Sequence, residues 1–215
     1  MWLRSATPII ISFCLMFFVS CSGGGDKKAA DPGNDTLSAK KSQKGKIKDV
    51  ANEKKPPIIN IVDTVAPKRM IVYIRDSATS SERIGIKLGQ IYGVKLTECF
   101  KKNALKITGS PMAWFKSQKA PFFFEAGIPV NKKPSRLTKG VNVKELPADS
   151  VVVAHFYGPY DLIHVGYEVL YDWMKTHNQH ATASPYEIYI SDPIDKKGKP
   201  VDPYKVQTDI VFPRK

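Results

Sequence analysis

The chain has 215 residues and a formal net charge of +13. An excess of positive charge of this size often marks nucleic-acid binding. Here the lysines are spread over tether-like and loop-like segments instead of gathering on one helix with interleaved aromatic residues. The pattern therefore argues against nucleic acid as a partner. It leaves two interpretations open, which are attraction to anionic lipid headgroups or an anionic envelope polymer, and a solvated surface that keeps the protein soluble.

Residues 1–21 have the pattern of an export signal. Arg4 precedes an apolar run, residues 8–19, which is too short to span a bilayer comfortably and stops shortly before Cys21 and a glycine-rich stretch. The segment resembles a bacterial lipoprotein signal peptide, because the four residues ending at Cys21 look like a lipobox with Phe18 where leucine is usual. The resemblance implies a lipidated Cys21 and a location in the cell envelope, as a periplasmic or outer-membrane lipoprotein. An ordinary secretory signal or a single anchor helix remains the alternative.

Residues 22–56 are predicted to be a flexible tether. The segment is rich in lysine, with Asp, Gly, Ser and Ala between, and it lacks the apolar residues needed to form a core. Of the three cysteines, Cys14 lies in the signal and Cys21 is the expected lipid site. Cys99 is left alone, so we expect no disulfide within the mature chain and a small buried apolar side chain at this position.

The remaining segment, residues 57–215, is long enough for one domain with a core of its own. It reads as two copies of one strand, helix, strand, strand unit, in halves of about 57–130 and 145–215. The first copy comprises residues 70–74, 81–105, 109–115 and 121–129, and the second comprises residues 151–156, 160–177, 183–189 and 206–213. Such a duplication favours an α+β fold with an antiparallel sheet, two long helices on one side and a ligand cleft between the halves.

Two connections are predicted to be exposed loops. Residues 131–144, between the copies, are rich in lysine and proline, and residues 192–202 form a charged turn between the last two strands. In the first helix the apolar stripe is irregular, and it includes Ile86 and Val94 beside better-spaced residues.

Glu187 is the most informative single residue. It lies in the strand-like run 185–190, where period-two alternation places it on the same face as Tyr189. Burying a carboxylate costs several kcal/mol unless a cation, a hydrogen-bond donor or a raised pKa offsets the loss of water. Matching the Ser-Pro pair of each copy sets Ala113 opposite Glu187 and Phe115 opposite Tyr189, so only the second copy carries the acid. The alternative is that Glu187 lies on the solvated face of a half-buried strand.

The second copy resembles the GyrI-like small-molecule-binding family, which includes the effector-binding domains of AraC- and MerR-type regulators. The resemblance rests on residues 155–160, 167–173, 184–193 and 208–213, and it extends more loosely back to Pro57. It implies a duplicated strand-helix-strand-strand fold and a pocket between the halves, lined with aromatic residues. In that family an acid at the position of Glu187 contacts ligands that are often cationic and aromatic. The chain shows no helix-turn-helix, so a role as a DNA-binding regulator does not carry over.

Carried over by position, the resemblance implies a ligand site formed by one acid and several aromatic residues: Glu187, Tyr189, Tyr167, Tyr171, Tyr157, Trp114, Phe115 and Tyr73. An aromatic pair at helical spacing is also typical of plain packing, so Tyr167 and Tyr171 could belong to the core. The histidines have no carboxylate or thiolate set around them, so no metal site and no cofactor are expected.

Three functions follow as hypotheses. The first is a membrane-anchored envelope protein that binds an amphipathic or cationic aromatic small molecule. The second is a hydrolase of reactive small molecules in which Glu187 acts as general acid or base, with Tyr167 or Tyr189 orienting the substrate. The third is a non-enzymatic interaction module whose pocket is filled by packed side chains. The protein partner, if there is one, is not indicated by the sequence.

Overall fold

The computed structural model describes residues 55–117 and 119–215, so the predicted signal, Cys21 and the tether up to residue 54 lie outside the described residues. The strands are β1 (Ile58–Ala66), β2 (Arg69–Ala78), β3 (Met112–Phe115), β4 (Phe122–Val130), β5 (Val141–Leu146), β6 (Asp149–Tyr157), β7 (Tyr186–Tyr189) and β8 (Gln207–Pro213). The helices are α1 (Ser81–Gln90), the π-helical turn η1 (Ile91–Lys95), α2 (Leu96–Asn103), the 3₁₀ turn η2 (Tyr160–Leu162), α3 (Ile163–Thr176) and the 3₁₀ turn η3 (Pro203–Lys205).

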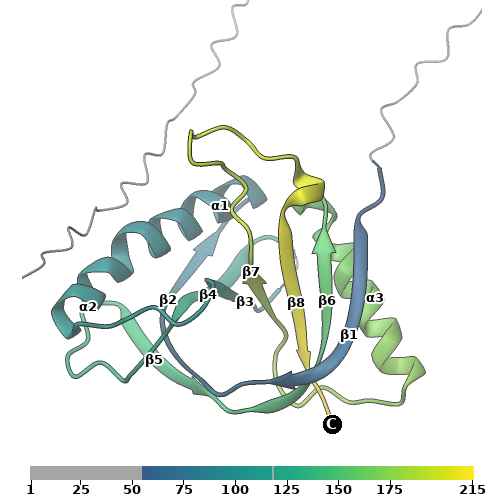
Figure 1. The fold of residues 1–215 in the computed structure, drawn as a ribbon, viewed down its shortest axis with the longest axis horizontal. Coiled ribbons are helices and arrows are strands. Elements are labelled where there is room, and N and C mark those ends of the chain that lie inside the picture. The colour runs from purple at the N-terminus through teal and green to yellow at the C-terminus, as the bar shows by residue number, and fades with distance from the viewer. Residues whose placement is uncertain (1–54, 118) are drawn as a thin grey trace, which may run out of the picture. The chain divides into compact units, whose positions relative to one another are not determined.

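All eight strands form one antiparallel sheet in the order β1-β6-β8-β7-β3-β4-β2-β5 (Figure 1). The α+β prediction with an antiparallel sheet and two long helices is confirmed. The two copies meet where β3 pairs with β7, and there Ala113 lies directly across from Glu187. Because the Ser-Pro match makes these two residues equivalent, the approximate twofold relation between the copies passes between them.

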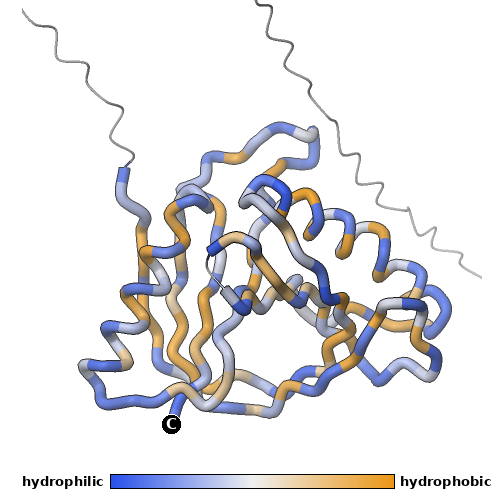
Figure 2. Tube along the Cα trace, turned by 180° about the vertical axis from the view of Figure 1, so that it is seen from behind, coloured by the Kyte–Doolittle hydropathy of each residue, from blue (hydrophilic) through white to orange (hydrophobic). Residues whose placement is uncertain are grey.

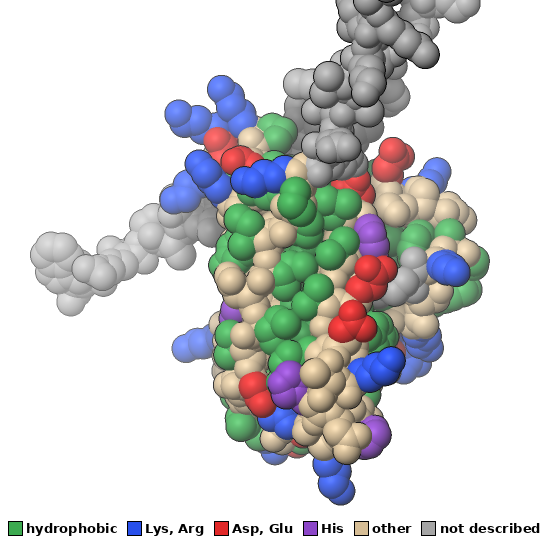
Figure 3. Space-filling view, turned by 90° about the vertical axis from the view of Figure 1, so that its right-hand side faces the viewer, with side chains coloured by type: hydrophobic (Ala, Val, Ile, Leu, Met, Phe, Trp, Pro, Cys, Tyr) green, Lys and Arg blue, Asp and Glu red, His purple; other side chains and the backbone are tan. Residues whose placement is uncertain are grey.

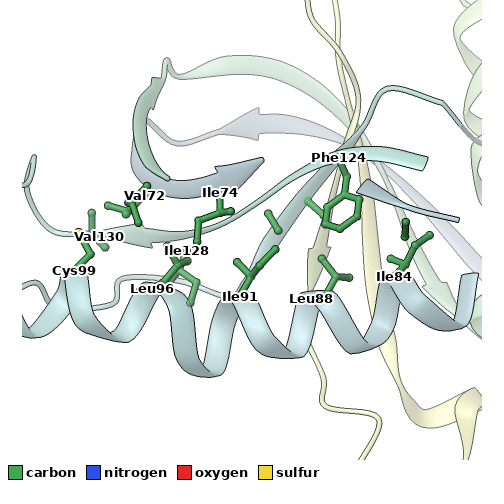
Figure 4. Packing of buried hydrophobic residues seen from close by; sticks show 14 residues of the cluster. Val72, Ile74, Ile84, Leu88, Ile91, Leu96, Cys99, Phe124, Ile128 and Val130 are labelled. Atoms are coloured by element: carbon green, nitrogen blue, oxygen red, sulfur yellow. The ribbon is translucent and has the colours of Figure 1, made fainter. Parts of the chain in front are cut away.

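Both long helical segments pack on the same face of the sheet. The α1-η1-α2 segment covers the first copy, where Ile84, Leu88 and Leu96 belong to one buried cluster with sheet residues that include Val72, Ile128 and Phe124 (Figure 4). The α3 helix covers the second copy through residues that include Leu170 and Met174. In Figure 2 the strands and the inward sides of the helices carry most of the hydrophobic residues. None of the helices within the described residues is long and apolar enough to cross a membrane.

The π-helical turn explains the irregular stripe of the first helix. The buried positions Ile84, Leu88 and Ile91 follow α-helical spacing, but the next buried residue, Leu96, comes five positions later. Inserting one residue in η1 brings Leu96 back to the sheet face. The predicted stripe members Ile86 and Val94 are exposed. Ile86 lies on the side of α1 that faces away from the sheet, and Val94 lies in the π turn, which displaces it from the buried stripe.

Two strands were missed in the sequence. The predicted loop 131–144 is wrong at its end, because Val141 begins β5, which pairs with β2 of the first copy. The strand β1 was also missed, and it pairs with β6 of the second copy. Each copy therefore receives its outermost strand from the segment that precedes the other copy. Local composition cannot show this exchange, since each edge strand is stabilised by a distant partner.

Figure 3 faces the side of the domain formed by β1 and α3 and shows a band of hydrophobic side chains there. The exposed apolar residues of β1 are Ile58, Ile61, Val62 and Val65. Arg214 at the end of the chain forms an ion pair with Asp63 on this strand. Within the described residues Cys99 is a free thiol on α2, and its side chain is buried, as expected for a small apolar side chain.

Candidate functional site: a carboxylate held by tyrosines

Glu187 lies in the middle of the sheet on the face that carries the helices. Its strand β7 joins the two copies, and its register neighbours are Ala113 on β3 and Ile210 on β8. The whole residue is 1% exposed. The alternative of a solvated strand face is therefore wrong for this residue, and the predicted common face with Tyr189 is confirmed.

Three tyrosine hydroxyls donate hydrogen bonds to the Glu187 carboxylate. Tyr167 on α3 reaches Oε1 at 3.0 Å, and Tyr189 on the same strand reaches Oε2 at 2.9 Å. Tyr160 of the η2 turn also donates to Oε2, and its hydroxyl lies 3.3 Å from that of Tyr189. These bonds replace part of the hydration that the carboxylate loses on burial.

The electrostatics leave this carboxylate without a counter-ion. Within the described part of the chain, no ion pair includes Glu187. Burial raises the pKa of Glu187, and the hydrogen bonds from Tyr160, Tyr189 and Tyr167 oppose part of that rise. Burial first and the negative charge of Glu187 second raise the pKa values of Tyr160, Tyr189 and Tyr92 well above the usual range. The tyrosines therefore remain neutral hydrogen-bond donors, and the site is suited to a positive charge.

Aromatic rings from both copies surround the carboxylate. The ring of Tyr189 lies 6.3 Å from that of Tyr92 on η1 and 6.4 Å from that of Tyr160. The Tyr92 hydroxyl donates to the backbone oxygen of Met112 at 2.9 Å, which holds this ring over the junction of β3 and β7. We refer to Glu187, Tyr92, Tyr160, Tyr167 and Tyr189 as the tyrosine site.

The sequence missed two members of the tyrosine site. The sequence pattern predicts Tyr160 only as the start of a helix, although this residue ends the run 155–160 that carries the family resemblance. It is 38% exposed, so it stands between solvent and the carboxylate. Tyr92 lies four residues after Leu88, so helical spacing places it on the sheet side of the first helix, although the sequence does not show that it reaches the acid of the other copy.

The other predicted lining residues are not brought to Glu187. Tyr171 is 59% exposed and meets Phe212 edge-on at 4.9 Å between ring centres. Phe115 shares the helix face but packs on Phe124 in the core of the first copy, with ring centres 5.7 Å apart. Tyr171 is therefore displaced from the carboxylate along α3, and Phe115 is displaced from it along the sheet.

Tyr157, Trp114 and Tyr73 lie on the opposite face of the sheet. Alternation explains this, since Trp114 follows Ala113 and Tyr73 follows the helix-facing Val72. The Tyr157 hydroxyl is engaged there with Gln207 at 2.7 Å. The expectation that these three line one pocket with Glu187 is wrong.

Two open cavities of the described residues lie on the face without helices. One of about 310 Å³ is bordered by Trp114 and Lys144, and one of about 180 Å³ is bordered by His155 and Asp209. Neither cavity includes Glu187, whose surroundings are occupied by the tyrosine hydroxyls. Across residues 55–117 and 119–215, no group of three or more His, Cys, Asp or Glu side chains could hold a metal ion.

Comparison with known proteins agrees with this architecture. No curated protein matches the chain. Among solved structures, the EcmrR C-terminal domain is similar with a TM-score of 0.59 and 22% identity over 74% of this chain and 98% of that one. The EcmrR–DNA complex in EcmrR-RPo gives a TM-score of 0.60 and 22% identity, and the matched region covers 73% of this chain and 57% of that one. A structure of SAV2435 bound to tetraphenylphosphonium has a TM-score of 0.45 and 11% identity, over 74% of this chain and 94% of that one.

The family model for the GyrI-like small molecule binding domain matches residues 66–215, which include both copies of the repeat and the whole tyrosine site. The chain therefore belongs to the GyrI-like small-molecule-binding family.

Proposed function

We propose that the tyrosine site binds an amphipathic small molecule that carries a positive charge and an aromatic body. The observation that carries this proposal is the buried Glu187 carboxylate, which has three tyrosine donors and no ion-pair partner among the described residues. A ligand cation supplies the missing counter-charge, and the rings of Tyr92 and Tyr189 supply faces for cation–π contact, worth about 0.5–2 kcal/mol each.

Binding requires Tyr160 to move, because its hydroxyl occupies the space beside the carboxylate. Tyr160 begins the three-residue η2 turn, which has no side-chain cap, and it follows Pro159 at the end of β6. A short uncapped turn of this kind opens at low free-energy cost compared with α3 or the sheet. The ligand then exchanges one tyrosine hydrogen bond for a charge pair with Glu187, while Tyr167 keeps its bond to Oε1.

The test measures binding of tetraphenylphosphonium and of neutral triphenylphosphine oxide to the full chain by isothermal titration calorimetry. We expect the cation to bind more tightly than the neutral compound, and Glu187→Gln to weaken cation binding by at least about tenfold, which is about 1.4 kcal/mol. Glu98→Gln is the matched control, because Glu98 is an exposed carboxylate whose ion pair with Lys102 lies on α2. Equal affinity of the wild type and Glu187→Gln for the cation would remove the carboxylate from the mechanism.

The proposal also includes a lipid anchor at Cys21 that holds the domain at a membrane of the cell envelope. Its support is the apolar run 8–19 followed by the lipobox-like residues that end at Cys21. Acylation gives stable anchoring when two or more chains are attached. Metabolic labelling with a fatty acid should mark the wild-type chain and not Cys21→Ser. An unlabelled wild-type chain that fractionates with soluble proteins would contradict the anchor and leave the ligand proposal unaffected.

A further inference from the structure

The face of the sheet without helices carries a pair of one basic and one acidic side chain at equivalent positions in the two copies. Following the register outward from Ala113 and Glu187 makes Glu125 equivalent to Asp209 and Arg75 equivalent to His155. Arg75 Nε lies 3.0 Å from Glu125 Oε1, and His155 Nδ1 lies 2.7 Å from Asp209 Oδ1. One basic partner thus serves one carboxylate at the same place in each half.

The first copy adds a further cation and a large aromatic residue. Lys144 on β5 lies with its Nζ 2.8 Å from Glu125 Oε2 and 3.2 Å from the centre of the Trp114 ring. Register places Thr64 at the position of Lys144 in the second copy, and Ile188 at the position of Trp114. Since Arg75 already balances Glu125, the Lys144 ammonium is surplus positive charge held against an aromatic face.

The larger cavity lies beside this surplus charge. Its volume is about 310 Å³, and its border includes Trp114, Lys144, Lys116, Leu146, Tyr186 and Pro213. The rings of Trp114 and Tyr186 lie 5.5 Å apart and form one aromatic wall. Lys116 on the rim is exposed and forms no ion pair among those found in the described residues. Glu125 and Ser184 also border the cavity, so its lining is mixed. Two lysines face one carboxylate there, which leaves the charge of the lining positive, and most of the remaining wall is apolar or aromatic.

We infer that this cavity is a second ligand site, for an aromatic carboxylate or sulfonate whose anion meets Lys144 and whose ring lies against Trp114 and Tyr186. The volume matches the small end of ligand pockets. The charge is opposite to that of the tyrosine site, and the two sites lie on opposite faces of one sheet. Burial lowers the pKa of Lys144 in spite of Glu125, so an added anion relieves the cost of keeping this ammonium charged.

The test titrates the full chain with 2-naphthoate, with neutral 2-naphthylmethanol and with cationic 2-naphthylmethylammonium, using calorimetry. We expect the anion to bind most tightly of the three. Lys144→Gln should raise its dissociation constant at least about tenfold, whereas Lys144→Arg should retain most of the affinity. Lys133→Gln is the matched control, because Lys133 is an exposed lysine in the loop before β5. Glu187→Gln should also leave naphthoate binding unchanged.

Two results would overturn the inference. One is equal naphthoate affinity in the wild type and Lys144→Gln, and the other is a preference for the neutral or cationic compound. If Lys144→Gln does not fold, NMR of the wild type decides the question. Naphthoate should then shift the indole resonance of Trp114 and leave that of Trp173 on α3 in place, and an unshifted Trp114 resonance would exclude the cavity. Competition by tetraphenylphosphonium would assign both compounds to one site and also contradict the inference.

Discussion

Replacing Glu187 by glutamine should stabilise the ligand-free protein at neutral pH while it weakens cation binding. Two opposing contributions change together. Glutamine keeps one acceptor oxygen and has an NH2 donor in place of the other, so the tyrosine hydroxyls on that side accept instead of donating. Hydrogen bonds to a charged acceptor are worth about 1.5–3 kcal/mol and neutral ones about 0.5–1.5, so loss of the charge weakens the three hydrogen bonds by roughly 3 kcal/mol in total. Against this, burying an ion costs several kcal/mol. The raised pKa of Glu187 indicates that burial outweighs the hydrogen bonds.

The sign of the pH dependence follows from the same shift. A carboxyl whose pKa is higher in the folded state binds protons more tightly when folded, so its contribution to stability falls as pH rises from the unfolded pKa, about 4.3, through the folded value. Below pH 4 the wild type and Glu187→Gln should therefore be similarly stable. At pH 7 the variant should be more stable by about 1 kcal/mol, or roughly 2–4 °C in melting temperature for a domain of this size.

The assay is thermal unfolding followed by circular dichroism between pH 4 and pH 8. The quantity of interest is the difference between wild type and variant, because acids such as Asp76 and Glu125 have lowered pKa values and contribute with the opposite sign. Glu98→Gln, an exposed carboxylate on α2, should change the melting temperature little at any pH. A variant less stable than the wild type at pH 7, or a difference that does not change with pH, would refute the reasoning.

Two further predictions concern hydrogen bonding and packing. Tyr167→Phe removes one donor to the buried carboxylate, so it should lower the free energy of unfolding, measured by urea titration, by about 1–3 kcal/mol. The control is Tyr171→Phe on an exposed side chain, which should change this free energy by less than about 0.5 kcal/mol. Gly127→Ala should destabilise the sheet by more than about 1 kcal/mol, because its Cβ would lie 2.7 Å from the backbone oxygen of Val72. Gly85→Ala, in α1 with open space around it, should instead stabilise the protein by about 0.5–1 kcal/mol, and the reverse order of these two variants would contradict the packing described.

Period-two alternation was sufficient to find the centre of the site. It placed Glu187 and Tyr189 on one face, and the Ser-Pro match identified Ala113 as the residue that turned out to lie across the joint. The same alternation, applied from Ala113, predicts that Trp114 lies on the opposite face of the sheet from Glu187. The family resemblance places Trp114 in the pocket instead, and this is wrong because the first copy resembles the family only loosely.

The site residues and strands that could not be predicted from the sequence depend on pairing between distant segments or on irregular helical turns. Leu96 returns to the sheet only because η1 is π-helical, and the gap of five residues after Ile91 is a weak signal for that turn. Tyr92 reaches Glu187 only because the two copies meet at β3 and β7. The composition of residues 131–144 indicated a loop, yet the alternation of Val141 and Val143 was enough for β5 once β2 offered a free edge. Pairing between segments so far apart is decided by the assembled sheet.

The exchange of edge strands has a consequence for the origin of the fold. Both exchanged strands leave their neighbours through a two-residue connection with proline at the equivalent position, Pro67 after β1 and Pro147 after β5. Proline keeps the preceding residue extended, which directs the chain onward to the far half and away from a tight hairpin. A single ancestral unit with this connection would have completed its sheet only by trading strands with a second copy. Joining two such units in one polypeptide lets both exchanges take place within a single chain, as β1 and β5 do here.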